Sequence, residues 1–470
     1  MTEKLRKTLR DSKMARWTVL VIVSLAMFSG YYIVDVMAPL MSELQETFGW
    51  DATEFGILGM SYGFLNVAFF MMIIGGMILD KLGIRITGIG ACALMIVGAG
   101  IKYYAVSQGV DDFAGEVFGI MSMQVFIASV GFAIFGVGLG IAGITLIKVT
   151  VRWFKGYELG LALAIQLAIS RLATALVMAT TTSITNHFGD LSAPVLLGLI
   201  GLCVGLVAYL IFCVMDVKLS ASGVNEEEEQ EEPFRLSDVR FVVKNKGFWL
   251  ITFLCLLYYS ALFPFLRYAV SLMEHKYAVS RDLTMMLPFG REFTNFDLAG
   301  TIVAMMPFVT MLLTPLFGAF YDKKGKGATI MLIGAALLTV VHLLLAAPFL
   351  NVWWFALFLM IVLGISFSLV PAAMWPAVPK IIPENLLGTA FALMFWVQGI
   401  GLTLVPFLIG WVLDSACCMT IAADGSIQYD YTIPMLIFAA FGILALVFAQ
   451  WLKKEDRKKG YGLEMPNMKQ

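Results

Sequence analysis

The sequence predicts an all-α membrane protein with twelve membrane-spanning helices in two six-helix bundles. Of its 470 residues, 60% are hydrophobic and only 14% are charged, whereas a soluble domain is usually about one quarter charged. The mean hydropathy is +0.86. Apolar runs of about 20 residues, the length that an α-helix needs to cross the hydrocarbon core, recur along almost the whole chain. These observations exclude an ordinary soluble domain.

Twelve apolar ranges account for the predicted spans. In chain order they are 17–41, 55–79, 86–107, 120–149, 157–182, 192–217, 247–272, 297–321, 327–350, 353–379, 387–413 and 432–452. The fourth range is longer than the others, so we expect it to tilt or to extend beyond the hydrocarbon.

Basic residues indicate the orientation of the spans. They gather in the N-terminal segment, in the C-terminal tail and in the loops on the same side, such as Lys81, Arg85, Arg152 and Lys323. The opposite loops carry few, namely Lys276, Arg281 and Arg291. Because loops rich in lysine and arginine stay in the cytoplasm, we expect both termini to be cytoplasmic, which requires an even number of spans.

An acidic segment divides the chain. We expect an N-terminal bundle over 1–218, a cytoplasmic linker over 219–246 and a C-terminal bundle over 247–470. The linker holds glutamates at 226–229, 231 and 232, followed by Pro233. Blocks of like charge are usually disordered, so the linker is expected to be a solvated connector, with a short amphipathic helix over 234–243 compatible with its sequence.

The two halves repeat one loop motif. "GMILDKLGIR" stands between spans two and three, and "GAFYDKKGKG" stands between spans eight and nine. In this pattern the first glycine allows close helix approach, the aspartate can meet the N-terminus of a helix in the other half, and the later glycine permits a tight turn. Alternatively, the basic residues only set topology. The residues of this predicted conformational latch are Gly76, Asp80, Gly83, Arg85, Gly318, Asp322 and Gly325.

With these motifs the chain resembles the major facilitator superfamily, whose best-known signature is this glycine–aspartate–basic loop. A narrower likeness covers nearly the whole membrane core and is carried by "GYYIVDVMAPL", "WFKGYELGL", "AIQLAISRLAT", "LYYSALFPFL" and "PAAMWPAVPKIIPENLLGTA". It points to the branch that contains the lysosomal dipeptide transporter of animals. The resemblance implies that Arg171 engages a substrate carboxylate and that Trp375 lies at the substrate site. The family's acidic residue in span four, expected to hold the peptide amine, is replaced here by Gly140.

Arg171 is the polar residue that most needs an explanation. It lies about fourteen residues into span five, roughly 21 Å along the helix, which is too deep to reach the cytoplasm comfortably. A guanidinium at this depth must face water or a partner. It either forms an ion pair with a buried carboxylate, Asp35 in the first instance, or offers its paired donors to a substrate carboxylate.

Asp35 is the only acidic residue well inside span one, and it shares a helix face with Tyr31 and Tyr32. It is a candidate ligand for a substrate ammonium or a proton, and it is equally compatible with a pairing to Arg171. Lys148 lies near the cytoplasmic end of span four. It either snorkels to the membrane surface or points inward, where a second cation would favour an anionic substrate.

Other polar and aromatic residues occur within the spans. Each of them is compatible with hydrogen bonding inside the bundle, but together they outline a cavity at mid-membrane. Trp375 stands between two prolines, which free backbone carbonyls where a chain can line water. The set contributed by spans two, five, seven, ten and eleven is Tyr62, Asn66, Gln166, Tyr258, Tyr259, Trp375 and Gln398.

We therefore expect a secondary transporter that works by alternating access. Dipeptides or related zwitterions come first as substrates, and small organic anions come second. The alternative of another class is a receptor or scaffold that uses the acidic linker to bind a partner.

The sequence holds no metal-ligand spacing, phosphate loop or nucleophile motif, so we expect neither an enzyme nor a cofactor, and no nucleic acid. We expect a monomer in the bilayer with protons as a possible coupling ion. The absence of an Asn-x-Ser/Thr sequon favours a bacterial inner membrane.

Overall fold

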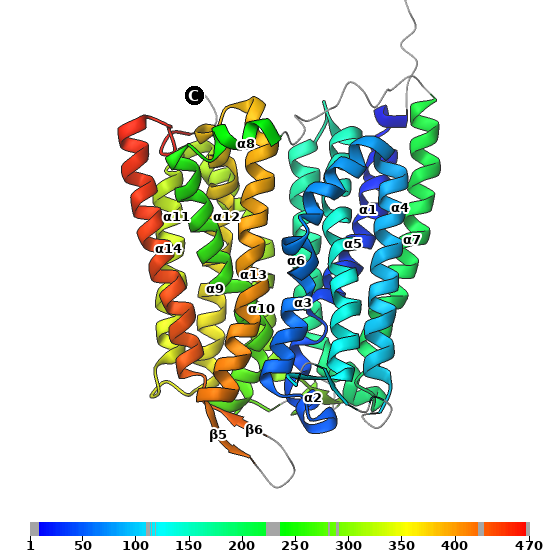
Figure 1. Cartoon of the computed structure of the whole chain (residues 1–470), viewed down its shortest axis with the longest axis vertical. Coiled ribbons are helices and arrows are strands. Elements are labelled where there is room, and N and C mark those ends of the chain that lie inside the picture. The colour runs from blue at the N-terminus through cyan, green and yellow to red at the C-terminus, as the bar shows by residue number, and fades with distance from the viewer. Residues whose placement is uncertain are drawn as a thin grey trace, which may run out of the picture.

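The computed structural model describes residues 9–109, 113, 115–117, 119–221, 236–280, 283–287, 291–421 and 427–466. The acidic run at 226–232 and Arg281 therefore lie outside the described residues. Two bundles of long helices stand side by side (Figure 1). The first contains α1 (Lys13–Asp35), α2 (Met41–Phe48), α3 (Ala52–Ala68), α4 (Met71–Ser107), α5 (Met123–Phe154), α6 (Leu159–Phe188) and α7 (Ala193–Ser220).

The second bundle contains α9 (Lys246–Tyr277), α10 (Leu298–Lys324), α11 (Gly327–Ala346), α12 (Trp353–Ile381), α13 (Leu387–Ala416) and α14 (Thr432–Lys459). The short helix α8 (Leu236–Val242) precedes it, within the range 234–243 where the sequence is compatible with a helix. We call the face where α1 begins and α14 ends the terminal face, and the opposite one the far face. Both lie at opposite ends of the bundles (Figure 1).

The number of spans agrees with the sequence. Within the described residues, eleven stretches are long and apolar enough to cross a membrane. One of them, Met71–Ser107, contains Gly83 at φ 73° and ψ 172°, so it joins the end of one span to the whole of the next. With α3 and the start of α4 taken together as one span, the predicted twelve are present.

The second span is not the continuous helix predicted over 55–79. It breaks at Phe70, which has a left-handed φ of 53° that is uncommon for a residue other than glycine. The break has a partner in the other bundle, because the indole of Trp396 on α13 donates to the carbonyl of Val67 at 3.0 Å. The rings of Phe70 and Trp396 stack with centroids 5.0 Å apart. The Trp396 indole thus replaces the helical hydrogen bond that the Val67 carbonyl lacks at the break.

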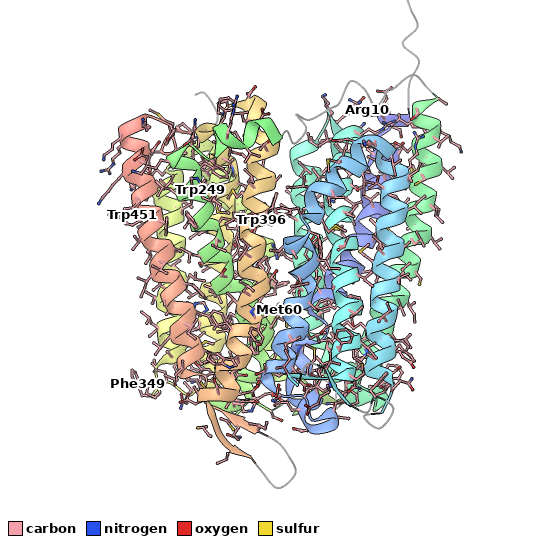
Figure 2. The ribbon with its side chains drawn as sticks, in the orientation of Figure 1. Arg10, Met60, Trp249, Phe349, Trp396 and Trp451 are labelled. Atoms are coloured by element: carbon pink, nitrogen blue, oxygen red, sulfur yellow. The ribbon has the colours of Figure 1, made fainter. Side chains whose placement is uncertain are left out.

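Small residues let α3 and α13 approach closely between this break and the far face. A Cβ at Gly56 would lie 2.7 Å from the Pro406 carbonyl oxygen, and one at Gly410 would lie 2.0 Å from the Ala52 carbonyl oxygen. Neither gap admits a side chain, so the two backbones are in direct contact, as in other membrane helix pairs built on glycine. Trp396 and Met60 lie where the bundles face each other, whereas Trp451 lies on the outer side (Figure 2).

Within the described residues, three antiparallel hairpins that the sequence analysis did not predict occupy far-face connections. They pair β1 (Glu116–Val117) with β2 (Met121–Ser122), β3 (Leu283–Leu287) with β4 (Arg291–Phe296), and β5 (Cys418–Ile421) with β6 (Ile427–Tyr429). The last of them projects from the far face beyond the helices (Figure 1). Its strand β6 supplies a tyrosine to the contact between the bundles described below.

The contact between α3 and α13 yields a testable expectation. Gly410→Leu should prevent the far face from closing, because its side chain would meet the backbone of Ala52. Spin labels at Thr47→Cys and Gln428→Cys, exposed residues of the two bundles, should then report a longer distance in electron-resonance measurements. Gly100→Leu is the matched control, since no atom lies within 4 Å of its Cβ position. An unchanged distance distribution for Gly410→Leu would contradict this packing.

Candidate functional site

Arg171 extends from α6 of the first bundle toward aromatic rings of the second. Its guanidinium carbon lies 4.6 Å from the ring centroid of Phe367 and 5.4 Å from that of Phe263. Arg171 is only half-buried, and among the described residues its guanidinium makes no hydrogen bond or ion pair. The rings attract the cation through their faces but satisfy none of its donors. These donors therefore remain available to water or to an anionic ligand.

Asp35 is the last residue of α1, which packs against α6, the helix that carries Arg171. Its Oδ2 accepts a hydrogen bond of 2.9 Å from the Thr174 hydroxyl, which lies one turn beyond Arg171 on α6. Within the described part of the chain, Asp35 and Arg171 form no direct ion pair, so the pairing considered from the sequence is not the arrangement found. The two charges nevertheless act on each other, and Tyr31 lies within electrostatic reach of both.

Aromatic residues of the second bundle connect Trp375 to Arg171. The Trp375 indole donates to the Tyr259 hydroxyl at 3.2 Å. The Tyr259 ring stacks on Phe263 with an interplanar angle of 7° and a centroid distance of 5.5 Å. Phe263 in turn faces the Arg171 guanidinium. Trp375 and Tyr259 therefore belong to the same group as Arg171, and they offer it an apolar wall.

Tyr62 and Asn66 lie on α3 against α5. The Asn66 side-chain nitrogen donates to the Gly136 carbonyl at 3.0 Å, and the Tyr62 ring lies 5.3 Å from that of Phe132. A Cβ at Gly140 would lie 3.5 Å from the Asn66 side-chain oxygen and 2.8 Å from the Met72 sulfur. Position 140 therefore faces Asn66, and the flexible Met72 side chain takes up the room that a longer residue there would need.

Three of the predicted site residues are engaged elsewhere. The Thr150 hydroxyl donates to the Gln166 side-chain oxygen at 3.2 Å in the contact between α5 and α6. The hydroxyl of the fully buried Tyr258 is 2.9 Å from that of Ser366. Lys148 Nζ lies 2.8 Å from Asp80, so the option that Lys148 points into the site is not the one found. Gln398 is 8% exposed on α13.

The latch residues lie at the terminal face, and the ion pairs described for Asp80 and Arg85 stay within the first bundle. Asp80 pairs with Lys148 rather than with a helix N-terminus of the second bundle. Arg85 Nε pairs with the buried Asp216 of α7 at 2.7 Å, and Asp322 lies in the last turn of α10. Gly83 and Gly325 have φ of 73° and 70°, as the tight turn requires.

The expectation that Gly76 and Gly318 permit close helix approach does not hold in this structure. No atom lies within 4 Å of the Cβ position of either residue, so neither makes a close contact with a neighbouring helix. The bundles meet instead along α3 with α13 and along α6 with α10, nearer the far face.

Two further cations, which the sequence analysis did not single out, lie within electrostatic reach of Asp35. Lys102 lies on α4 and is fully buried, and Arg267 lies on α9 and is half-buried. Both face the ring of Phe132 on α5, with Lys102 Nζ 4.0 Å and the Arg267 guanidinium carbon 5.6 Å from its centroid. Each is an isolated cation in an apolar run, which is the signal that singled out Arg171 and would have found them.

A second polar cluster holds the far face closed. Asp414, at the end of α13, accepts hydrogen bonds from the backbone nitrogens of Ala52 and Thr53 at 3.2 and 2.6 Å. It also accepts the Tyr429 hydroxyl at 2.8 Å, which itself accepts from the Gln45 amide. A carboxylate of the second bundle thus caps the N-terminus of α3 in the first, where the helix dipole favours negative charge. We call these residues the far-face gate.

Asp51 is the N-cap of α3 and lies beside Asp414. Its side chain accepts from the Glu54 backbone nitrogen at 2.7 Å in a capping box. Burial raises the pKa of Asp51 to about 6, and the neighbouring carboxylates of Asp414 and Glu54 add to the rise. The closed gate therefore holds this carboxyl in an environment that favours its protonated form.

Comparison with known proteins adds a family match. The model of the Major Facilitator Superfamily matches residues 20–406 and 282–465. The chain is 27% identical over 413 residues to the lysosomal dipeptide transporter MFSD1 of Homo sapiens, covering 85% of this chain and 80% of that protein. It is 28% identical over 411 residues to MFSD1 of Danio rerio, covering 85% and 81%.

Solved structures share the fold. A bacterial homologue of the human lysosomal transporter Spinster superposes with a TM-score of 0.67 at 14% identity, over 95% of this chain and 98% of that one. The nucleoside transporter NupG gives 0.63 at 13% identity, over 93% and 99%. PepTSo2 gives 0.60 at 15% identity, over 94% and 99%. At these identities the likeness speaks for the fold alone.

The gate can be tested by removing its charge. Asp414→Asn should shift the protein toward a far face that is open, because hydrogen bonds to a charged acceptor contribute about 1.5–3 kcal/mol, or about a 10- to 100-fold change in the ratio of states. Distances between spin labels at positions 47 and 428 would report it. Asp190→Asn is the control, since Asp190 bonds to Ser192 within the first bundle. Equal distance distributions for the two variants would show that Asp414 does not hold the gate.

The gate should also respond to pH. If opening exposes Asp51 to water, its pKa returns from about 6 toward the ordinary 3.8, so the closed gate binds the proton more tightly. This stabilisation of the closed state is complete below pH 3.8 and is lost as the pH rises through about 6. We expect the open fraction to increase over this window in the wild type, and the increase to shrink in Asp51→Asn. The same pH response in both proteins would exclude Asp51 as its source.

Proposed function

Because the chain belongs to the major facilitator superfamily, we propose that it is a transporter of small solutes that carry a carboxylate, bound between the two bundles by Arg171. One observation carries this proposal. Arg171 is half-buried at the meeting of the bundles, faces Phe263 and Phe367 across the interface, and makes no hydrogen bond or ion pair with a described residue. A guanidinium in that position matches the two oxygens of a carboxylate.

Dipeptides are the first substrate class that we propose. The relatives that align over 85% of the chain are named lysosomal dipeptide transporters, and the aromatic group of Trp375, Tyr259 and Phe263 offers a wall for an apolar side chain. Asp35 is the carboxylate beside Arg171 that would hold the peptide ammonium. It would take the part that the acidic residue of span four plays in the family, which is absent here at Gly140.

Small organic anions are the second class. The observation that favours them is the number of basic groups around Asp35, since Arg171, Lys102 and Arg267 all act on it. A solute without an ammonium would leave the Asp35 carboxylate to interact with these basic groups, and the solute carboxylate would still bind Arg171.

The proposed cycle moves the bundles 1–218 and 247–470 as two bodies joined by the linker 219–246. In this structure the far face is closed by the gate and by the contact of α3 with α13, while Asp80 and Arg85 bond within their own bundle at the terminal face. Opening the gate while the terminal face closes would expose the site to the other side. Asp80 and Asp322 would then serve as the latch of that second state. Protons are the coupling ion that we propose, since the chain holds carboxyl groups at both the site and the gate.

The proposal extends to orientation and place. We assign the terminal face to the cytoplasm, because lysine and arginine concentrate there. We propose that the protein is a monomer. We place it in a bacterial inner membrane, since no glycosylation sequon occurs in the sequence. Transport into proteoliposomes is accordingly the direct assay.

Arg171→Ala tests the proposal. We expect uptake of labelled dipeptides or dicarboxylates into proteoliposomes to fall at least about 100-fold, because the substrate carboxylate loses its charged partner. Arg171→Lys should restore part of it as a single-point cation. Arg240→Ala is the matched control, since Arg240 is an exposed residue of α8. Uptake by Arg171→Ala equal to that of the control would remove Arg171 from the site, and uptake of neither solute class by the wild type would overturn the proposal itself.

A further inference from the structure

Two arginines reach across the interface from opposite sides. Arg171 extends from the first bundle to Phe263 and Phe367 of the second. Arg267 extends from α9 of the second bundle toward the first, where its Cδ and Nε lie 3.2 and 3.4 Å from the Cβ position of Gly59 on α3. Its guanidinium carbon lies 5.6 Å from the ring of Phe132 on α5. Gly59 thus leaves the room that the Arg267 side chain occupies.

The charges around Asp35 are unbalanced. Arg267, Arg171 and Lys102 all lie within electrostatic reach of it, so two arginines and a lysine accompany one carboxylate. Lys102 is committed to the protein, because its Nζ donates to the Ile33 carbonyl at 3.3 Å and faces Phe132 at 4.0 Å. The two arginines differ from it. Both are half-buried, and in the part of the chain that the structure describes neither makes a hydrogen bond or an ion pair.

The free-energy cost of removing the two guanidiniums from water indicates which ligands they would bind. A charge withdrawn from bulk water is costly unless a partner of opposite sign and hydrogen bonds offset it. Asp35 is a single carboxylate whose Oδ2 already accepts from Thr174, so it cannot satisfy two five-donor guanidiniums. Position 140 faces Asn66 but is a glycine and supplies no second acid. Two anionic groups of a solute would supply the missing partners.

We propose that the site selects solutes with two carboxylates, one bound by Arg171 and the second by Arg267. This inference rests on the proposed function and specifies its substrate class. Two sources of this chemistry fit. A dipeptide with an acidic side chain would place its ammonium at Asp35, and a dicarboxylate of similar length would leave Asp35 among the cations. Arg267 is therefore a residue that determines specificity, whereas Arg171 serves every substrate.

Matched ligand pairs test the inference on the wild-type protein in proteoliposomes. Alanyl-glutamate and alanyl-glutamine have nearly the same shape and differ by one charge, and so do succinate and succinamate. We expect the doubly anionic member of at least one pair to compete for uptake at about tenfold lower concentration or less, since a charge-assisted pair contributes about that factor or more. A preference in the first pair identifies acidic dipeptides, and one in the second identifies dicarboxylates.

Arg267→Gln then assigns the preference to its residue. It should abolish the difference within the preferred pair while uptake of the singly charged member stays measurable, and Arg267→Lys should retain part of the difference. Retained uptake of the singly charged member also shows that the variant is folded. Arg240→Gln is the control and should keep the preference.

The outcomes separate the two proposals. Equal competition by both members of both pairs, with uptake still abolished in Arg171→Ala, would overturn the two-carboxylate inference and leave the proposed function standing. A preference that survives in Arg267→Gln would overturn the assignment to Arg267. If the wild type moves none of the four solutes, the proposed function fails first.

Discussion

The organisation of this protein depends on how charges are accommodated inside a membrane. A single arginine at mid-membrane costs about 2.5–3.5 kcal/mol on insertion scales, so the chain must offer each one a partner or water. Arg171 and Arg267 are not neutralised by ion pairs with described residues. They lie where the two bundles meet, half-buried and flanked by aromatic rings. On the proposed function a solute binds at this interface, and its anionic groups supply the partners that these charges lack.

At the far face, close backbone contact between the bundles adds to the side-chain bonds of the gate. Here α3 and α13 meet through glycines such as Gly56 and Gly410, and Asp414 adds a directional cap to the N-terminus of α3. Both contacts are strong when formed, and water can replace them when the helices part. The break at Phe70 ends this contact zone with Trp396, so that the rest of the second span is free to follow its own bundle.

The sequence predicted the fold well because the constraints of a bilayer are one-dimensional. The length of the apolar runs predicted the spans, and the sign of the charges in the loops predicted their orientation. It could not predict the break at Phe70, because an aromatic residue in a left-handed conformation has no local signature and depends on Trp396, more than 300 residues away. The hairpins such as β5–β6 escaped for a similar reason, since short strands in loops carry little pattern.

Residue type alone predicted only some of the residues of the candidate site. It singled out Arg171, Asp35 and Trp375. Arg171 reaches the aromatic group that includes Trp375, and Asp35 bonds to Thr174 one turn from Arg171, whereas Lys148 pairs with Asp80. Depth along a helix does not tell which way a side chain points, and Lys148 shows the consequence. Arg267 and Lys102 were overlooked because no motif drew attention to them, although isolated cations in apolar runs carry the same physical meaning as Arg171.

The most direct test of this account is a structure of the purified protein in lipid nanodiscs with saturating alanyl-glutamate, determined by electron cryo-microscopy. The account predicts solute density between the bundles, with one carboxylate within hydrogen-bond distance of the Arg171 guanidinium. An empty interface, or an Arg171 side chain that has turned to lipid or to a protein carboxylate while the solute binds elsewhere, would contradict it.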